Sequence, residues 1–353
     1  MENLKSSHTY NEIISQSEVW KTTINQISSQ RETILKWLKK AQNQVIFTGC
    51  GSTYYLSLHA AAVWQQLTNT FCRGLPSSEI WLFPTTGIKN TQSLLIATSR
   101  SGYTTETLKA ISVFTKLYGD NSIAITCYKD QDISKLATHT IVAEDASEQS
   151  IAQTRAFTSM VIIADYLAGL ISNNDGFIND LTLLPNIVER LIHGYNNDLE
   201  VLGHNLDFDH FIFLGSGSNY GIACEAMIKM KEMTLSNSEA YHFLEFRHGP
   251  KSIVNSKTAI VGILSDTAKK EENAVLEDMK KLGAYVIAVD ESGENIHTDK
   301  VFCLNSTVGE IFHGILALPL LQLLAYYRAI AKNLDPDRPA NLSSVVTLDC
   351  RKD

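Results

Sequence analysis

The sequence lacks closely spaced cysteine pairs, although its 353 residues include six cysteines, and no pattern of a secretory leader precedes them, so none is expected. The six are scattered and form no CxxC pair, which is typical of a protein in a reducing compartment. No group of histidine, cysteine and aspartate residues has the spacing of a metal site. We therefore expect a cytoplasmic protein that uses neither a metal nor another cofactor.

An excess of basic residues is also lacking. The sequence has 30 Lys and Arg against 38 Asp and Glu, so its formal net charge is −8. Because nonspecific nucleic-acid binding depends on basic side chains that displace counterions from phosphates, no nucleic-acid partner is expected. An anionic ligand would have to be held by a few local groups.

A long uninterrupted apolar run is missing as well. The most apolar segment extends from Ile311 to Tyr327 and falls short of the roughly 20 residues that cross a bilayer. It also contains a histidine, a glycine, a proline and a glutamine. We expect no membrane contact and predict that this segment is a buried core helix.

Apolar residues are nevertheless abundant enough for large cores. The hydrophobic fraction is 44% and the charged fraction 19%, as in ordered globular proteins. Single cores rarely exceed roughly 250–300 residues, so a chain of this length suits two domains. Residues 1–40 carry apolar positions at helical spacing and predict one or two N-terminal amphipathic helices.

From residue 44 onward, short apolar runs alternate with longer helix-like stretches, a pattern typical of βαβ units and parallel sheets. A polar, glycine-containing stretch at 172–180 separates two sets of these runs. We predict a first domain over 41–175, a second over 195–335 and a C-terminal tail over 336–353. The predicted strands are 45–49, 93–99, 122–128 and 138–144 in the first domain, and 211–215, 259–265, 285–290 and 299–304 in the second.

The two halves repeat one another. VIFTGCGSTYY begins at 45 and FIFLGSGSNYG at 211, an offset of 166 residues that also pairs Ser99 with Ser265. Both serines come just after an apolar strand, so the repeat extends beyond one motif. The sequence therefore predicts an α/β fold of two tandem doubly wound, flavodoxin-like parallel-sheet domains.

Two hydroxyl-rich stretches follow predicted strands of the first domain, GCGST at 49–53 and TSRSGYTTET at 98–107. In an open parallel sheet, ligands bind beyond the carboxyl ends of the strands, beside helix N-termini with free N–H groups. The sequence lacks GxxxxGK[ST] and the third glycine of GxGxxG, so a small phosphoester fits better than a nucleotide. These stretches predict either a phosphate cradle or ordinary helix N-caps. The candidate phosphate-binding residues are Gly51, Ser52, Thr53, Ser99, Ser101 and Thr104.

Three charged residues recur at helical spacing in the second half. Glu225, Lys229 and Glu232 lie at i, i+4 and i+7 in CEAMIKMKEM, on one face of a predicted helix. The pattern is typical of a solvated ion-pair stripe, whereas a carboxylate that faces a sugar would be a general base. In the first half, Glu148 of SEQSIAQTRAFTSM has the character of an acidic residue at a helix start.

A histidine-containing loop is predicted at 239–254, EAYHFLEFRHGPKSIV. His248 precedes Gly249-Pro250, which places it in a turn rather than inside a helix. A lone surface histidine is usually inert, but one beside a carboxylate carries protons near neutral pH. Both interpretations of His248 stay open on the residues themselves.

Together, GCGST, TSRSGYTTET, SEQSIAQTRAFT, IKMKE, EFRHGP and DRPANLSSVVTLD resemble the motifs of tandem sugar-isomerase (SIS) domain proteins. The resemblance covers about residues 44–349 and is greatest to the isomerase half of glucosamine-6-phosphate synthase and its stand-alone relatives. Those relatives include aminosugar-6-phosphate deaminases, AgaS-like proteins and fructosamine-6-phosphate deglycases. The resemblance implies two SIS domains and a sugar-phosphate ligand.

By position, the resemblance also assigns roles to residues. The implied sugar-phosphate loop comprises Ser99, Arg100, Ser101 and Thr104, beside Ser52 and Thr53, and the residues implied to line the sugar are Ile151 and Gln153. Whether Arg100 touches phosphate or packs beside it stays open. The resemblance makes Glu232 the proton-transfer base, Lys229 its support, and His248 the ring-opening group donated by a neighbouring subunit. A homodimer with shared active sites is therefore implied.

Two features depart from the synthase pattern. The chain begins Met1-Glu2-Asn3 without room for a glutaminase domain, so transfer of glutamine nitrogen is not expected. The tail lysine that forms a Schiff base in the synthase aligns with Ser344 here, and Lys352 lies a few residues away. We expect acid–base chemistry rather than covalent imine catalysis by the tail.

The resulting hypothesis is a phosphosugar isomerase/deaminase that acts on an aminosugar or fructosamine 6-phosphate by proton transfer between C1 and C2. One alternative is simple aldose/ketose 6-phosphate isomerisation without loss of an amine. The other is a noncatalytic phosphosugar sensor, although a transcription regulator would normally add a helix-turn-helix domain.

Overall fold

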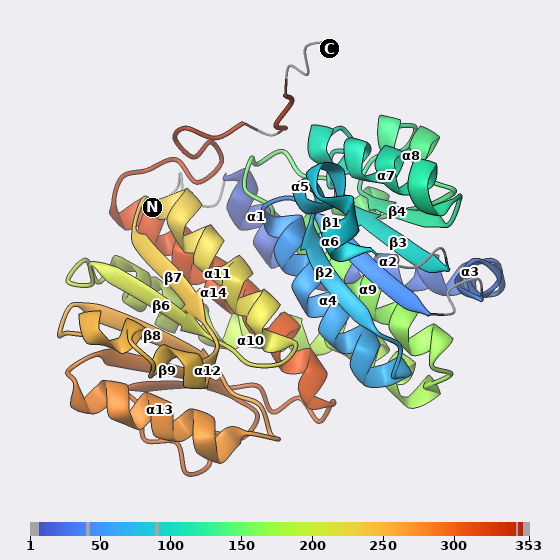
Figure 1. Ribbon diagram of the computed structural model, residues 1–353. Coiled ribbons are helices and arrows are strands. Elements are labelled where there is room, and N and C mark those ends of the chain that lie inside the picture. Colours follow the sequence, from blue (N-terminus) through green and yellow to red (C-terminus); the bar gives the residue numbers. More distant parts are fainter. Residues whose placement is uncertain (1–6, 40–42, 89–91, 344, 349–353) are drawn as a thin grey trace. The chain divides into compact units, whose positions relative to one another are not determined.

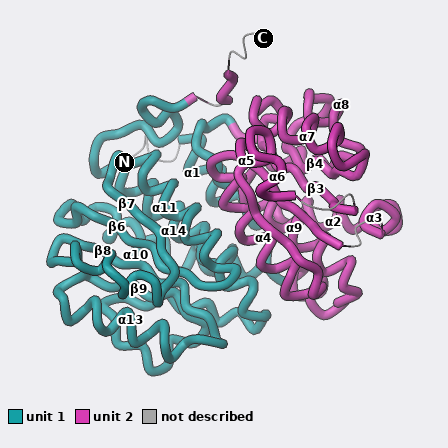
Figure 2. The backbone as a smooth tube through the Cα atoms, in the orientation of Figure 1, with its two compact units in different colours: residues 1–18, 149–154, 183–342 teal, residues 19–148, 155–182, 343–353 magenta. Residues whose placement is uncertain are grey.

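The computed structural model describes residues 7–39, 43–88, 92–343 and 345–348, and its helices and strands are labelled in Figure 1. The chain divides into two compact units, which Figure 2 shows in different colours. Unit 1 comprises Met1–Glu18, Gln149–Thr154 and Leu183–Leu342, and unit 2 comprises Val19–Glu148, Arg155–Thr182 and Ser343–Asp353. The domain boundaries expected from sequence stay a prediction.

The sheet of unit 2 has the strand order β2-β1-β3-β4-β5, and all neighbouring strands are parallel. The three central strands β1, β3 and β4 are buried over their whole length, as expected for near-continuous apolar runs in a parallel sheet. The strands are β1 (Gln44–Gly49), β2 (Cys72–Pro76), β3 (Ser93–Thr98), β4 (Ser122–Thr126) and β5 (His139–Val142).

Two helices of unit 2 matter for the site, because each begins just beyond the carboxyl end of a central strand. Helix α4 (Ser52–Thr68) follows β1 and contacts β1, β2 and α9, whereas α7 (Thr105–Tyr118) follows β3 and contacts β3, α5 and α8. The remaining helices are α2 (Gln16–Ser29), α3 (Arg31–Leu38), α5 (Ser77–Leu82), α6 (Pro84–Gly87), α8 (Asp132–Leu136), η2 (Glu144–Ala146) and α9 (Arg155–Ile171).

The sheet of unit 1 repeats this topology, with the order β10-β9-β8-β6-β7 and all pairs parallel. Its strands are β6 (His210–Leu214), β7 (Asn237–Tyr241), β8 (Thr258–Ile263), β9 (Tyr285–Asp290) and β10 (Lys300–Cys303). Its helices are α1 (His8–Ile14), α11 (Asn219–Thr234), α12 (Phe243–Phe246), η3 (Pro250–Ile253), α13 (Lys269–Lys281), η4 (Glu310–Phe312) and α14 (His313–Ala331), together with most of α10 (Asp175–His204).

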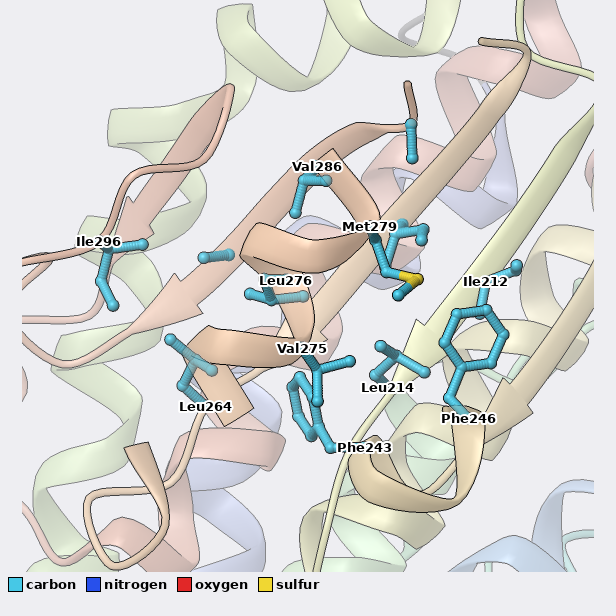
Figure 3. Close-up of a cluster of buried hydrophobic side chains, with 13 residues drawn as sticks. Ile212, Leu214, Phe243, Phe246, Leu264, Val275, Leu276, Met279, Val286 and Ile296 are labelled. Atoms are coloured by element: carbon cyan, nitrogen blue, oxygen red, sulfur yellow. The ribbon is translucent and has the colours of Figure 1, made fainter. Parts of the chain in front are cut away.

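An apolar cluster fills the space between the sheet of unit 1 and helices α12 and α13. Figure 3 shows aromatic rings from α12 and aliphatic side chains from α13 directed toward side chains of the strands. Burial of each such side chain stabilises the unit by roughly 1.5–3 kcal/mol. The labelled members are Ile212, Leu214, Phe243, Phe246, Leu264, Val275, Leu276, Met279, Val286 and Ile296.

The most apolar segment is a core helix, as predicted. Nearly all of α14 is buried, and it contacts α11, α1 and β8. The apolar stretch Glu310–Ala331 has 22 residues, so it is longer than expected and meets the length and composition of a membrane span, but 89% of its most apolar window is buried inside the protein. That burial is what a core helix requires.

The predicted α/β fold of two doubly wound domains is confirmed. In strand order and direction both sheets correspond to the flavodoxin-like arrangement, and the turns that follow β1 and β6 carry the aligned glycines Gly51 and Gly217, each with φ of 56°. Gly51 comes directly before α4 and Gly217 two residues before α11, and glycine suits both positions because a Cβ-bearing residue rarely adopts this φ.

Two strands were missed. β2 and β7 occupy the same edge position in their sheets and are mostly half-exposed, so their sequences CRGLP and NSEAY contain no apolar run. The N-terminal segment also differs, because residues 8–38 form α1, α2 and α3 rather than one or two helices. β2 and β7 are strands because they pair with a neighbouring strand, and their local sequence patterns do not predict them.

Candidate functional site

The first part of the candidate site is the turn between β1 and α4 in unit 2. The Thr53 hydroxyl accepts a hydrogen bond from the Cys50 N–H at 2.8 Å and donates to the Cys50 carbonyl at 2.9 Å. A Cβ on Gly49 would lie 2.4 Å from Thr53 Oγ1, so the turn requires glycine there. Thr53 thus closes the turn, and burial raises the pKa of the neighbouring Cys50 thiol, which disfavours a reactive thiolate.

The second part is the hydroxyl loop, residues 99–104, which connects β3 to α7. Ser99 Oγ lies 3.0 Å from Thr104 Oγ1 and accepts the Gly102 N–H at 3.2 Å, while Ser101 Oγ accepts the Tyr103 N–H at 3.2 Å. Thr104 is the residue that precedes the first turn of α7. Because β1 and β3 are adjacent at the point where the strand order reverses, the turn after β1 and the hydroxyl loop lie at one sheet edge, where α/β folds bind ligands.

The corresponding loop of unit 1 is already engaged by a side chain. Ser265 donates its N–H to Glu272 at 2.7 Å and its hydroxyl to the same carboxylate at 3.0 Å. Glu272 is 1% exposed, and burial raises the pKa of its carboxyl despite the hydrogen bonds from Ser265 and Ser216. A carboxylate therefore takes the donors that an anion would need, which makes the hydroxyl loop of unit 2 the better candidate for phosphate.

Arg100 of the hydroxyl loop pairs with Glu148 within unit 2. Arg100 Nη1 donates to Glu148 Oε2 at 3.0 Å, and the two side chains are 8% and 0% exposed. Glu148 Oε1 also accepts the N–H of Ala156, the second residue of α9. Glu148 precedes α9 by seven residues, so it supports the helix start from a buried position rather than from the first turn.

Residues 149–154 belong to unit 1 and are held there by a carboxylate and a main-chain carbonyl from distant parts of the chain. Glu12 of α1 accepts the N–H of Gln149 at 2.6 Å and also accepts hydrogen bonds from Ser150. The N–H of Ile151 donates to the Asp337 carbonyl at 3.0 Å. Within the residues that the structure describes, the side-chain oxygen of Gln153 is buried and has no hydrogen-bond partner. It offers an acceptor to an O–H or N–H group.

The charged residues of α11 form a buried cluster in unit 1, not a solvated stripe. Lys229 Nζ lies 2.7 Å from Glu232 Oε2 and 3.4 Å from Glu225 Oε1. The side chains of Glu225 and Lys229 are 0% and 1% exposed, whereas that of Glu232 is 21% exposed. Glu232 is therefore a carboxylate that is held by an ammonium group and still reached by solvent.

His248 lies in an exposed turn of unit 1 between α12 and η3, as the Gly-Pro sequence predicts. Its N–H donates to the Glu245 carbonyl at 3.0 Å, and Gly249 follows with a φ of 118°. His242 differs from it, because its ring stacks on Tyr220 with centroids 3.8 Å apart. Burial lowers the pKa of His242, which opposes a positive charge on that ring.

The predicted residues therefore fall into separate groups within the units. In unit 2 the structure brings together Gly51, Ser52, Thr53, Ser99, Arg100, Ser101 and Thr104 at the carboxyl ends of β1 and β3. In unit 1, Lys229 and Glu232 are in contact, His248 lies on its own loop, and Ile151 and Gln153 lie in the segment held by Glu12. Ser344 and Lys352 lie outside the described residues.

Sequence reasoning missed the roles of Glu12 and Asp337. Asp337 accepts hydrogen bonds from Ser7 Oγ at 2.6 Å and from the Thr9 N–H at 2.7 Å, at the start of α1. Nothing local in the sequence marks either carboxylate, because their partners are more than a hundred residues away. In the part of the chain that the structure describes, no cluster of three or more His, Cys, Asp or Glu side chains is placed to hold a metal.

Comparison with protein families gives a match that covers more than half of the chain. The profile of the SIS domain matches residues 38–169 and 207–331. The first matched segment contains all the strands of the unit 2 sheet, and the second contains all the strands of the unit 1 sheet.

Individual proteins are also similar to this chain. A glutamine–fructose-6-phosphate aminotransferase (isomerizing) from Caldanaerobacter subterraneus subsp. tengcongensis is 28% identical over 96% of this chain and 56% of that protein. The chain thus spans about half the length of this curated relative. A solved glucosamine-6-phosphate deaminase from Thermotoga maritima is 26% identical, with a TM-score of 0.79 over 97% of this chain and 100% of the other. A tagatose-6-phosphate ketose/aldose isomerase from Escherichia coli shares the fold, with a TM-score of 0.87, 19% identity and 96% coverage of each chain.

Proposed function

Because the chain belongs to the SIS-domain family, we propose that it is a phosphosugar isomerase, and specifically an isomerase/deaminase of an aminosugar or fructosamine 6-phosphate. The observation that carries the proposal is the cluster on α11, in which Lys229 holds the partly exposed Glu232. The names of two similar proteins, the aminotransferase and the deaminase, each specify a hexose 6-phosphate and chemistry at an amino group.

The phosphate is assigned to the hydroxyl loop. Ser99, Ser101 and Thr104 place short hydroxyl groups just before the first turn of α7, where free backbone N–H groups and the helix dipole favour an anion. The fixed backbone of Gly51 leaves room on the turn after β1, since a Cβ there would meet nothing within 4 Å. A compact dianion on a small sugar suits these donors better than a nucleotide does.

Proton transfer is assigned to Glu232. In the open-chain aldose form of an aminosugar 6-phosphate, its carboxylate removes the proton from C2 and returns it to C1. A second proton passes from the C2 amine to the C1 oxygen, so the aldehyde becomes an alcohol and the amine becomes an imine. Lys229 keeps Glu232 oriented through the 2.7 Å hydrogen bond. Water adds to the C2 imine and ammonia leaves, so the products are a ketose 6-phosphate and ammonia.

Ring opening is assigned to His248 of the partner subunit in a homodimer. An exposed imidazole on a turn is suited to protonate the ring oxygen of a sugar that belongs to a neighbouring site. Mixing a Glu232→Gln variant with a His248→Ala variant tests this sharing, because each mixed dimer regains one complete site. Activity of the mixture above that of either variant is expected, whereas no recovery would place His248 in its own subunit's site or outside catalysis.

The reaction is tested with glucosamine 6-phosphate. Release of ammonia together with fructose 6-phosphate supports the deaminase assignment. Conversion of aldose and ketose 6-phosphates without ammonia release from any aminosugar would replace it by simple isomerisation. Saturable binding without turnover of any substrate in a panel of hexose, hexosamine and fructosamine 6-phosphates would replace both by a sensor.

The role of Glu232 is tested by Glu232→Gln. We expect kcat to fall by about 10²- to 10⁴-fold, the usual contribution of a general base, while the Kd for the sugar phosphate changes little. Glu271→Gln is the matched control, because Glu271 is an exposed glutamate of the same unit in the first turn of α13. Retention of full kcat by Glu232→Gln would exclude Glu232 as the base.

A further inference from the structure

Arg100 differs from the other residues of the hydroxyl loop, because its side chain is engaged by a buried carboxylate. The Arg100–Glu148 contact joins residues 48 positions apart, at 3.0 Å, with side chains 8% and 0% exposed. A guanidinium group that is so enclosed offers little surface to a phosphate. The inference that follows rests on the proposed function, since it concerns how the same loop is held for its ligand.

Both ends of this contact are attached to fixed backbone. The Arg100 carbonyl accepts the N–H of Cys127 and the hydroxyl of Thr126, each at 3.1 Å, at the end of β4. On the other side, Glu148 accepts the Ala156 N–H at 3.1 Å, and its carbonyl accepts the Tyr128 hydroxyl at 3.2 Å. The pair therefore connects the hydroxyl loop, the end of β4 and the start of α9 within unit 2.

The charges of the pair also matter for an anion. A bare buried arginine would attract phosphate toward itself, and a bare buried glutamate would repel it, but the paired charges largely cancel. The remaining effect of the pair is on geometry, because an arginine–carboxylate contact fixes the direction of both side chains. The adjacent residues Ser99 and Ser101 are then held by the same backbone that Arg100 anchors.

We propose that Arg100 is a positioning residue: its ion pair with Glu148 fixes the hydroxyl loop against β4 and α9, and the phosphate is bound by the loop's hydroxyl and N–H groups rather than by the guanidinium. Glu148 is then a positioning residue as well. The proposal assigns a role to both members of the pair. It also distinguishes Arg100 from the phosphate-binding residues with which the resemblance groups it.

The two roles of Arg100 give opposite results when Glu148 is neutralised. Arg100→Gln, Glu148→Gln and the double variant are compared with the wild-type chain, using Kd for inorganic phosphate and for glucosamine 6-phosphate. Lys129→Gln and Glu144→Gln are the matched controls, because Lys129 and Glu144 form an exposed ion pair in the same unit. The double variant leaves neither buried charge without its partner, so it keeps the test available if a single variant unfolds.

For a positioning pair, each single variant weakens binding of both probes by about 10- to 100-fold, the range expected when binding groups shift by up to about 1 Å. The double variant is no weaker than the singles, because the two residues act as one unit. For a phosphate-binding arginine, Glu148→Gln would instead bind both probes as tightly as wild type or more tightly. That result, or unchanged affinity in all three variants, would overturn the proposal.

A readout without ligand keeps this proposal distinct from the proposed function. The Gly102 N–H is held by Ser99 Oγ within the hydroxyl loop, so its hydrogen-exchange rate reports whether the loop is fixed. Faster exchange at Gly102 is expected in Glu148→Gln and not in Glu144→Gln. If exchange changes in this way but no sugar phosphate binds the wild-type chain, the proposed function fails and the positioning role stands; if exchange is unchanged, the positioning role fails.

Discussion

Replacement of Lys229 by methionine should destabilise the protein by about 3–5 kcal/mol at pH 7, the usual effect of removing one partner from a buried ion pair. The structure places this lysine at the upper end of such effects. Its side chain is 1% exposed and lies 2.7 Å from Glu232 and 3.4 Å from Glu225, whose own side chain is 0% exposed. Without the ammonium group, Glu225 and Glu232, which lie two turns apart on α11, both lose the cation between them, and Glu225 is buried without it.

The destabilisation is measured by urea unfolding followed by circular dichroism. For a unit of this size a change of 1 kcal/mol moves the melting temperature by about 2–4 °C, so a fall of about 6–20 °C is expected in a thermal scan. Methionine nearly preserves the length and apolar stem of lysine, so the change reports mainly the charge. Lys231→Met on the same helix is the control, because Lys231 is exposed and should change stability by at most about 0.5 kcal/mol.

A second substitution separates charge from packing. Lys229→Met combined with Glu225→Gln removes the buried carboxylate charge together with its cation, and it should recover much of the lost stability. The reasoning is refuted if Lys229→Met is no more destabilising than Lys231→Met. It is also refuted if the double variant is less stable than Lys229→Met, because the buried charge of Glu225 would then not be the cause.

Two further predictions concern the ends of helices. Burial tends to raise the pKa of Asp337, but hydrogen bonds from Ser7 and Thr9 outweigh burial and lower the pKa below 3.8. The stabilisation of the folded protein by this carboxylate is therefore present above the unfolded pKa and lost as pH falls through the folded pKa. Asp337→Ala should therefore cost about 1–2 kcal/mol at pH 7 in urea unfolding and progressively less below about pH 4; a pH-independent cost would contradict this. Gly51→Ala should lower the free energy of unfolding by about 1–3 kcal/mol in the same assay, because a φ of 56° with a ψ of −126° suits glycine. Gly194→Ala within α10 is the control and should be neutral or stabilising, because a Cβ there would meet nothing within 4 Å.

Local pattern was sufficient for much of the fold. Buried strands such as β1 and β3 are continuous apolar runs, and the repeat of VIFTGCGSTYY in FIFLGSGSNYG predicted that the two sheets share one topology. The hydroxyl-rich stretch at 98–107 was placed correctly at a strand end, since a strand, a turn and a helix start are all encoded within a few residues. Edge strands β2 and β7 could not be predicted in this way, because pairing with a neighbour defines them.

The sequence by itself therefore determined the apolar strands and their alternation with helices, the duplicated turn with Gly51 and Gly217, and the position of the hydroxyl loop. Tertiary structure decided which charged groups are buried and with whom. The spacing of Glu225, Lys229 and Glu232 was equally compatible with a solvated stripe, and packing around α11 made it a buried cluster. Arg100 meets Glu148 across 48 residues, and Asp337 meets Ser7 across 330. The physical reason is that burial and pairing depend on groups far apart in the chain, whereas turns and apolar periodicity depend on neighbours.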